Sequence, residues 1–316
     1  MDIFFLLAAN IFPLYILIAL GYVAGRWMDV NLHSMAIIAI YFLAPMVNFS
    51  AMLRLQFDPA YIALPVAIFL GSAAIGIVTY NFARRRWKDN SVNLISMSSV
   101  TGNTGYFGLP IILALFDPKY AGIYLLMNTG LIISELGLGY YFGARGHADV
   151  KGALMKVIKL PVVHAVWLGL LFNFLDARPS ALFIRYADYA TGAWVLVGMM
   201  LIGIALGKQE KIVFEPRLIK WLFTAKFLLW PLFGAAFIAA DSLFLHLFDP
   251  TIYAMMAVFC SVPLAGNLVA YAATLNLQPE RVAGAVLAST LIALFTVPLA
   301  LYLFRLYENF GLAFNH

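Results

Sequence analysis

Long apolar runs separated by short polar segments dominate the pattern along the 316-residue chain. Each run is long enough to cross a hydrocarbon core about 30 Å thick, which takes an α-helix of roughly twenty residues. Charged residues gather between the runs instead of alternating with apolar residues along them, as they would on a half-exposed surface helix. The pattern predicts ten transmembrane helices, at residues 3–25, 32–53, 60–83, 92–116, 119–143, 155–175, 188–207, 217–240, 251–274 and 280–304.

Composition supports an all-α integral membrane protein. Hydrophobic residues make up 64% of the chain and charged residues 11%, whereas soluble domains are about one-quarter charged. The first run is preceded by Asp2 instead of a basic region and has no small-residue cleavage site, so we expect a permanent helix and not a signal peptide. The lipid bilayer is therefore the expected partner of most of the surface.

The basic residues predict an orientation. Fourteen of the 20 Lys and Arg residues fall on one set of alternate loops and five on the other, while Lys226 lies within a run. By the positive-inside rule the richer side is cytoplasmic, which places both termini outside the cytoplasm of a multi-pass protein of the cell (inner) membrane. One missing or extra helix would exchange all later loops and remove this bias. The net charge of +5 thus reflects topology, and we expect no nucleic acid partner.

Helix-breaking residues concentrate in the fourth and ninth runs. The segment Thr101–Pro110 contains three glycines and a proline, which cost a continuous helix about 6 kcal/mol relative to alanine. The segment Ser261–Asn267 again combines a proline, a glycine and an asparagine. Both segments lie near the middle of their runs. The sequence therefore predicts that helices 4 and 9 are broken at mid-membrane depth.

Broken helices at this depth indicate an internal binding site. Unpaired backbone groups are tolerated in the bilayer only where protein or a watery cavity satisfies them. Half-helix N-termini carry a positive dipole end that suits a carboxylate, and asparagine amides can donate to the same oxygens. A small organic anion is the predicted ligand. In the alternative interpretation, glycine and proline serve only close helix packing and kinks.

The chain also shows signs of an internal repeat. Pro13 and Gly21 in the first run are spaced like Pro161 and Gly169 in the sixth, at an offset of 148 residues. The broken helices are likewise each fourth in their half. Because five is an odd number of crossings, two such halves have opposite topology, as in many secondary carriers. We expect a first five-helix repeat at residues 1–150 and a second at 151–316.

Two motifs carry a family resemblance. The segment Gly102–Pro110, and a second stretch running from Ser261–Pro263 through Asn276 and Pro279 to Ala288–Thr290, resemble the auxin efflux carrier family. That family includes plant auxin exporters and, more similar in the first motif, bacterial carriers of malonate, malate and related acids. The resemblance implies a fold like that of bile-acid symporters and sodium/proton antiporters, in which helices 4 and 9 cross.

The resemblance also implies that the helices divide into a scaffold and a transport bundle. Helices 1, 2, 6 and 7 would form a scaffold that pairs two copies into a homodimer, and helices 3–5 and 8–10 would form a mobile, elevator-like transport bundle. An asparagine beside the fourth-helix break contacts the substrate carboxylate in plant exporters, and Asn103 occupies the matching position. Pro110 and Pro263 would flank the crossover. The chain departs from plant exporters in having no acidic residue inside the third run.

Within the runs, polar residues supply the remaining candidates. Glu135 and Lys226 lie about 12 and 14 Å from the cytoplasmic face at a rise of 1.5 Å per residue, and they are candidates for coupling to ion transport. A purely structural pair, or a lysine that extends to the interface, is the alternative. The predicted substrate-binding residues are Asn103, Thr104, Gly105, Pro110, Asn128, Thr129, Pro263, Gly266, Asn267 and Tyr271.

These features predict secondary-active transport of a mono- or dicarboxylate by alternating access at the crossover of helices 4 and 9. No cofactor or metal site is expected, and coupling to protons or sodium stays open. A sodium-coupled symporter of the bile-acid type is the alternative, with Thr101, Asn103, Thr104 and Asn267 as oxygen ligands, and a channel is a further one. An enzyme is not expected, because the chain contains neither an HExxH nor a GxSxG motif.

Overall fold

The computed structural model describes residues 3–144, 155, 158–275 and 277–314, which form helices and connecting loops without a β-strand. The predicted repeat boundary at residues 150 and 151 and the basic residues Arg145, Lys151 and Lys156 lie outside the described residues, as does Asn276 of the second motif.

Helices occupy each of the first five predicted ranges. Several of them are assembled from α-helical and π-helical or 3₁₀ turns that follow one another along the chain. They are α1 (Ile3–Trp27); α2 (Leu32–Ile37), a π-helical turn (Ile38–Leu43) and α3 (Ala44–Leu53); a 3₁₀ turn (Pro59–Ile62) and α4 (Ala63–Ala83); α5 (Ser91–Ser99), a π-helical turn (Thr104–Gly108) and α6 (Leu109–Leu115); and a 3₁₀ turn (Pro118–Tyr120), α7 (Ala121–Ser134), a π-helical turn (Glu135–Gly139) and α8 (Tyr140–Gly143).

Helices also occupy the later five ranges. They are α10 (Pro161–Phe174); α11 (Ala181–Gly207); α12 (Pro216–Thr224), a π-helical turn (Ala225–Leu229), α13 (Trp230–Ala240) and a second π-helical turn (Asp241–Leu245); α14 (Pro250–Ser261) and α15 (Leu268–Thr274); and α16 (Pro279–Phe314).

The lengths and composition of these helices fit a multi-pass membrane protein. Six stretches of described residues are long and apolar enough to cross a bilayer. They are Leu32–Leu53, Pro59–Ala83, Pro118–Gly143, Ala181–Gly207, Pro216–Leu245 and Pro279–Leu306, and shorter apolar helices occupy Ile11–Trp27, Pro161–Phe174 and Pro250–Ser261.

Helix α11 begins seven residues before the predicted start of its run at residue 188. Ser180 caps it, because the Ser180 side chain accepts a hydrogen bond from Phe183 N at 3.2 Å. Asp188, the first residue of the predicted run, lies on the exposed side of the helix and forms an ion pair with Arg54 at 3.1 Å. The predicted start at residue 188 left the charged Arg185 outside the run, whereas the structure places it within the helix.

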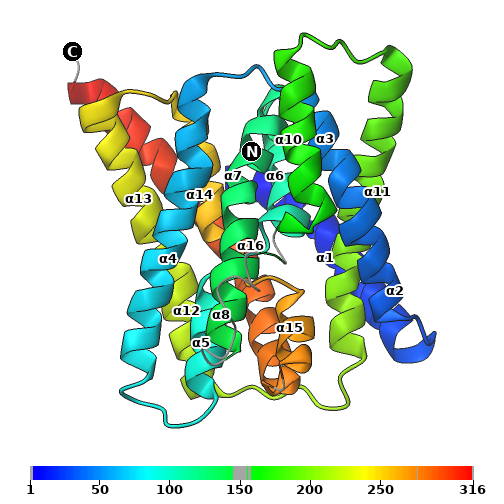
Figure 1. Cartoon of the computed structure of the whole chain (residues 1–316). Coiled ribbons are helices and arrows are strands. Elements are labelled where there is room, and N and C mark those ends of the chain that lie inside the picture. The colour runs from blue at the N-terminus through cyan, green and yellow to red at the C-terminus, as the bar shows by residue number, and fades with distance from the viewer. Residues whose placement is uncertain (1–2, 145–154, 156–157, 276, 315–316) are drawn as a thin grey trace.

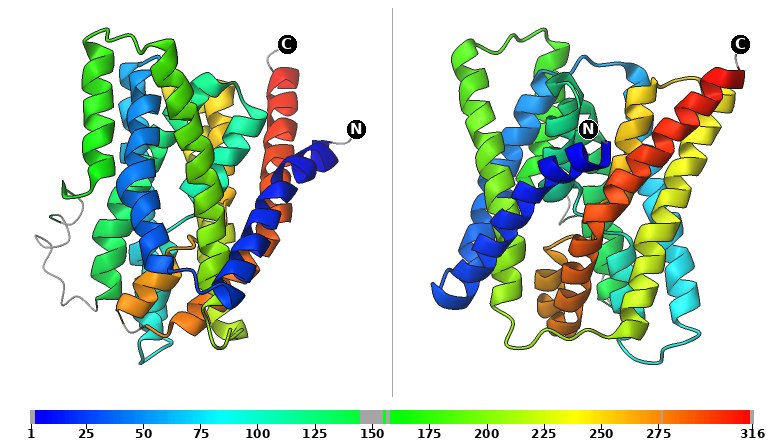
Figure 2. Two further views of the ribbon diagram at one scale, coloured as in Figure 1. Left: turned by 90° about the vertical axis from the view of Figure 1, so that its right-hand side faces the viewer. Right: turned by 180° about the vertical axis from the view of Figure 1, so that it is seen from behind.

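Two groups of helices pack side by side (Figure 1). The first group consists of α1, α2, α3, α10 and α11, in which α1 packs along α11 and α10 along α3. The second group contains α4 to α8 and α12 to α16, in which α4 packs on α5 and α7, and α14 on α13 and α16. Figure 2 shows that α16 crosses the back of the molecule and lies beside α1. The broken helices of the second group face the first group.

Glycines allow backbone contact within the first group. A Cβ atom on Gly203 of α11 would lie 1.9 Å from Ile18 O of α1, and one on Gly21 of α1 would lie 2.2 Å from Met200 O of α11. The contact of α10 with α3 has the same form, since a Cβ atom on Gly169 would lie 2.7 Å from Phe49 O. Such small residues bring membrane helices close enough for extensive van der Waals contact.

The close contact between α1 and α11 predicts that the loss of stability on replacing a glycine depends strongly on its position in α11. Gly203→Leu forces a side chain against the α1 backbone and is expected to cost about 3 kcal/mol of stability. Gly192→Leu in the same helix is the matched control, because no atom lies within 4 Å of a Cβ atom placed there. Thermal melting of the purified variants in detergent measures the difference. Equal melting temperatures would contradict the close contact.

Candidate functional site

The break in the fourth helical segment spans residues 100–103. At the end of α5, side chains donate hydrogen bonds to backbone carbonyls that have no partner within the helix. Trp230 Nε1 donates to Ser99 O at 2.8 Å, and Thr101 Oγ1 donates to Ser98 O at 2.9 Å. The chain then re-enters a helix, in which Gly108 N donates to Asn103 O at 3.0 Å. The break is therefore four residues long, shorter than the predicted segment Thr101–Pro110.

The break in the ninth segment follows Ser261. Val262 is extended, with φ −65° and ψ 156°, because a residue before proline is disfavoured from the α conformation. Asn103 N of the first break donates to Pro263 O of this one at 2.9 Å. Leu264 N donates to Ser289 Oγ of α16 at 3.2 Å. The two predicted interruptions are thus present, and a backbone hydrogen bond joins them.

A cavity of about 280 Å³ lies where the two breaks meet. Both helix groups contribute to its wall: the π-helical turn Ile38–Leu43, α3, α10 and α11 on one side, and the two breaks, α7 and α15 on the other. Six predicted substrate-binding residues line it, together with the coupling candidate Glu135. The six are Asn103, Thr104, Gly105, Asn128, Asn267 and Tyr271.

The other four predicted residues do not line the cavity. Pro110 lies in the first turn of α6, and Pro263 contributes its carbonyl to the bond with Asn103 N. Thr129 Oγ1 donates to Leu125 O of its own helix at 3.0 Å. Gly266 packs against α11, since a Cβ atom there would lie 2.6 Å from Ile202 Cγ1. These four residues shape the backbone and the helix packing around the crossover, the region where the two breaks meet.

Two hydrogen-bond networks cross the cavity wall. Asn267 Nδ2 donates to Glu135 Oε1 at 2.7 Å and lies 3.2 Å from Tyr271 Oη, so the second break is tied to the acidic residue at the end of α7. Thr104 Oγ1 donates to Asn128 Oδ1 at 2.5 Å, which ties the first break to the middle of α7. Glu135 thus has polar partners within the wall.

Lys226 is 1% exposed and lies behind the cavity wall. Its Nζ atom would be 2.7 Å from a Cβ atom on Gly102, and it lies 4.8 Å from the centre of the Trp230 ring. Among the salt bridges between described residues, none within 4.0 Å joins Lys226 to Glu135. The ammonium group instead adjoins the break that follows α5, where a positive charge offsets the negative end of a helix.

Three polar atoms of cavity-lining residues are buried without a hydrogen-bond partner: Asn103 Nδ2, Trp194 Nε1 and Asn48 Oδ1. Leaving such a group unpaired costs about 1 to 3 kcal/mol. Trp194 is not among the predicted site residues, whereas the position of Asn48 beside Pro45 made it a secondary candidate for the cavity lining. The signal for Trp194 was its place inside a run, since tryptophan usually gathers at the membrane interfaces.

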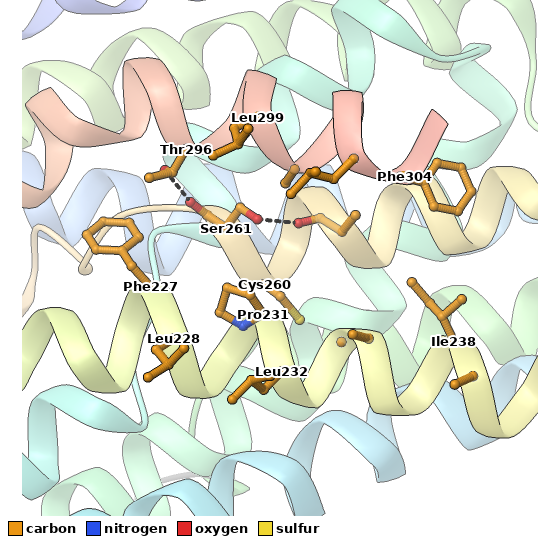
Figure 3. A pocket seen from close by; sticks show the side chains of 16 residues that line it. Phe227, Leu228, Pro231, Leu232, Ile238, Cys260, Ser261, Thr296, Leu299 and Phe304 are labelled. Atoms are coloured by element: carbon orange, nitrogen blue, oxygen red, sulfur yellow. Dashed lines mark hydrogen bonds between the residues drawn. The ribbon is translucent and has the colours of Figure 1, made fainter. Parts of the chain in front are cut away.

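A larger cavity of about 470 Å³ lies between α13, α14 and α16 (Figure 3). Its polar side chains are engaged within its own wall: Thr296 Oγ1 donates to Ser261 O at 3.2 Å and Ser261 Oγ to Ala257 O at 2.7 Å. The remaining lining is apolar, including Leu228 and Leu299, which are each about half exposed. This cavity suits hydrocarbon and offers nothing to a carboxylate.

The Thr104–Asn128 bond predicts unequal effects of two threonine substitutions. Thr104→Val removes the donor to Asn128 Oδ1 and is expected to cost about 1 to 3 kcal/mol, because a buried acceptor loses its partner. Thr129→Val, the control, removes a bond only to its own helix and is expected to be nearly neutral. Thermal melting compares the two. A larger loss for Thr129→Val would contradict this geometry.

Comparison with known proteins agrees with a transport role. Residues 6–137 match the family described as membrane transport protein. Over 156 residues the chain is 28% identical to the uncharacterized transporter MJ1031 of Methanocaldococcus jannaschii, which covers 47% of this chain and 50% of that protein. Over 306 residues it is 22% identical to the lysosomal cholesterol signaling protein of Mus musculus, which covers 86% of this chain and 34% of that protein.

The chain thus spans half of the first relative and about a third of the second. The matched family region runs from α1 into the π-helical turn after α7 and includes the whole first break. The family description and the name of the archaeal relative both refer to transport. Residues 6–137 are therefore similar to a family of membrane transport proteins, in agreement with the resemblance of the sequence motifs to a carrier family.

Proposed function

We propose that this protein is a secondary-active carrier of a small organic anion, which binds through a carboxylate in the crossover cavity. The observation that carries the proposal is Asn103 Nδ2, a buried amide donor without a partner in a residue that lines this cavity. A carboxylate oxygen is the acceptor that such a donor would gain. Hydrogen bonds to charged groups stabilise by about 1.5 to 3 kcal/mol.

The surrounding backbone favours a negative charge. The helical segment that begins at Thr104 continues through α6 to Leu115, so its N-terminal end, with its partial positive charge, lies at the cavity. Lys226 adds a positive charge behind Gly102. An anion next to Asn103 is therefore in a favourable field.

Alternating access follows from where the cavity lies. Its wall combines Tyr41 and Trp194 of the first helix group with Asn103 and Asn267 of the second. A ligand held there contacts both groups, and movement of α4 to α8 and α12 to α16 against the other helices would expose it to either side of the membrane in turn. The first group corresponds to the scaffold and the second to the transport bundle of the proposed elevator.

Two observations support ten crossings arranged as two inverted halves. Gly21 of α1 contacts α11, and Gly169, at the equivalent position of α10, contacts α3, so first and sixth segments make equivalent contacts across the halves. The loops after α1, α4 and α11, which the sequence flanks with basic residues, lie at the same lower end of Figure 1. We assign this end to the cytoplasm and both termini to the outside of the cell (inner) membrane.

Sodium coupling is the alternative, and Lys226 argues against it. A sodium ion at the crossover would be repelled by the nearby ammonium group. Glu135, which lines the cavity, is the candidate for coupling to protons.

Replacing Asn103 tests the site. Asn103→Ala is expected to weaken substrate binding at least about tenfold, which corresponds to the loss of 1.4 kcal/mol, without loss of folded protein. Asn81→Ala is the control, because the Asn81 amide donates only to Ile77 O of its own helix. Saturable uptake into proteoliposomes and ligand-dependent thermal stabilisation measure affinity. Unchanged affinity in Asn103→Ala would exclude this residue as the carboxylate ligand.

Ion replacement tests the coupling. The initial rate of uptake is expected to stay the same when choline replaces all sodium, because Lys226 supplies the positive charge at the crossover. The measurement compares substrate uptake in matched sodium and choline buffers at constant pH. A saturable dependence of uptake on sodium would favour the symporter instead.

A further inference from the structure

We propose that the indole N–H of Trp194 and the side-chain amide of Asn103 together hold one carboxylate group, and that Glu135 restricts the cavity to substrates with a single negative charge. This inference rests on the proposed carrier function and names the substrate class and a specificity-determining residue for the same site.

Trp194 lies directly on the start of the helix that follows Asn103. A Cβ atom on Gly105 would approach Trp194 Cη2 to 3.0 Å, and the Tyr106 ring packs on the indole at a centroid distance of 5.2 Å. Glycine at position 105 therefore permits the indole of α11 to contact the first turn after the break. Trp194 is 4% exposed, so this contact is buried.

The donors of this pair match a carboxylate. An indole N–H can only donate, and an amide nitrogen donates twice. Trp194 Nε1 and Asn103 Nδ2 are both buried without a partner, and the Tyr106 hydroxyl interacts with Trp194 without reaching hydrogen-bond geometry. A carboxylate has two oxygens that accept, so it would satisfy both donors at once.

The Glu135 carboxylate is expected to repel a second negative charge on the substrate. This carboxylate belongs to the wall of the same cavity, and none of the described lining residues is Lys, Arg or His. Lys226 lies behind Gly102, next to the first carboxylate, so a second substrate carboxylate would find no cationic side chain in the lining and would adjoin the Glu135 carboxylate within a cavity of about 280 Å³. Apolar side chains such as Ile132, Leu136 and Val162 make up much of the remaining wall and suit the uncharged body of a monocarboxylate.

The position of the two donors adds a mechanical consequence. Trp194 belongs to α11 of the first helix group, whereas Asn103 belongs to the break in the second. A carboxylate bound to both would link the groups, and an uncharged analogue would link them more weakly. Binding of the anion would thus favour the arrangement in which the groups are close together.

The test measures binding of butyrate and succinate, acids with four carbons and one or two carboxylates, to the 316-residue protein in detergent. We expect the wild-type protein to bind butyrate at least tenfold more tightly than succinate. Trp194→Phe should weaken butyrate binding about tenfold and weaken binding of the uncharged methyl ester much less, because hydrogen bonds to a charged acceptor are the stronger ones. Trp167→Phe is the matched control, because Trp167 is 68% exposed on α10. Glu135→Gln should reduce the preference for butyrate over succinate.

These outcomes distinguish a failure of the proposed roles of Trp194 and Glu135 from a failure of the proposed carrier function. Equal butyrate affinity in Trp194→Phe and Trp167→Phe would overturn the role of Trp194 and leave the carrier function standing. A parallel loss of acid and ester binding in Trp194→Phe would show a structural role and overturn it as well. A wild-type preference for succinate, which needs no variant to detect, would overturn the single-charge rule. Saturable uptake of any organic anion decides the proposed carrier function independently.

Discussion

The structure depends on how two interrupted helices satisfy their backbone polar groups inside a bilayer. An unpaired N–H or C=O in hydrocarbon costs several kcal/mol, so each break must find partners within the protein. Asn103 N and Pro263 O supply one another, and Trp230 and Ser289 complete the two breaks from α13 and α16. The crossover exists because the two breaks meet, and the remaining helices of the second group enclose it.

The closely packed first helix group forms the surface that lies opposite the crossover. Glycines hold α1 against α11 and α10 against α3, so that the inner side of α11 presents Trp194 to the first break. The cavity therefore lies between two helix groups that differ in how their helices are held together. One consists of continuous helices in backbone contact, and the other is organised around two breaks.

The sequence predicts the breaks well because helix propensity is a local property. The concentration of Gly, Pro and Asn near residues 102 and 263 locates both interruptions. It does not reveal which side chains face inward. Asn128 and Thr129 are adjacent, yet only Asn128 lines the cavity, because neighbouring helical residues point about 100° apart. Trp194 was missed because its inward direction depends on how distant helices pack.

Substrate protection of a single cysteine is the most direct test of binding at the crossover. Cys260 is the only cysteine of the chain and lines the apolar cavity, so Cys260→Ser supplies a background for Ile132→Cys, which lines the crossover cavity. We predict that a transported organic acid slows thiol labelling at position 132, with half-protection at the concentration that half-saturates uptake. Labelling that stays unchanged while the acid is transported saturably would contradict binding at the crossover.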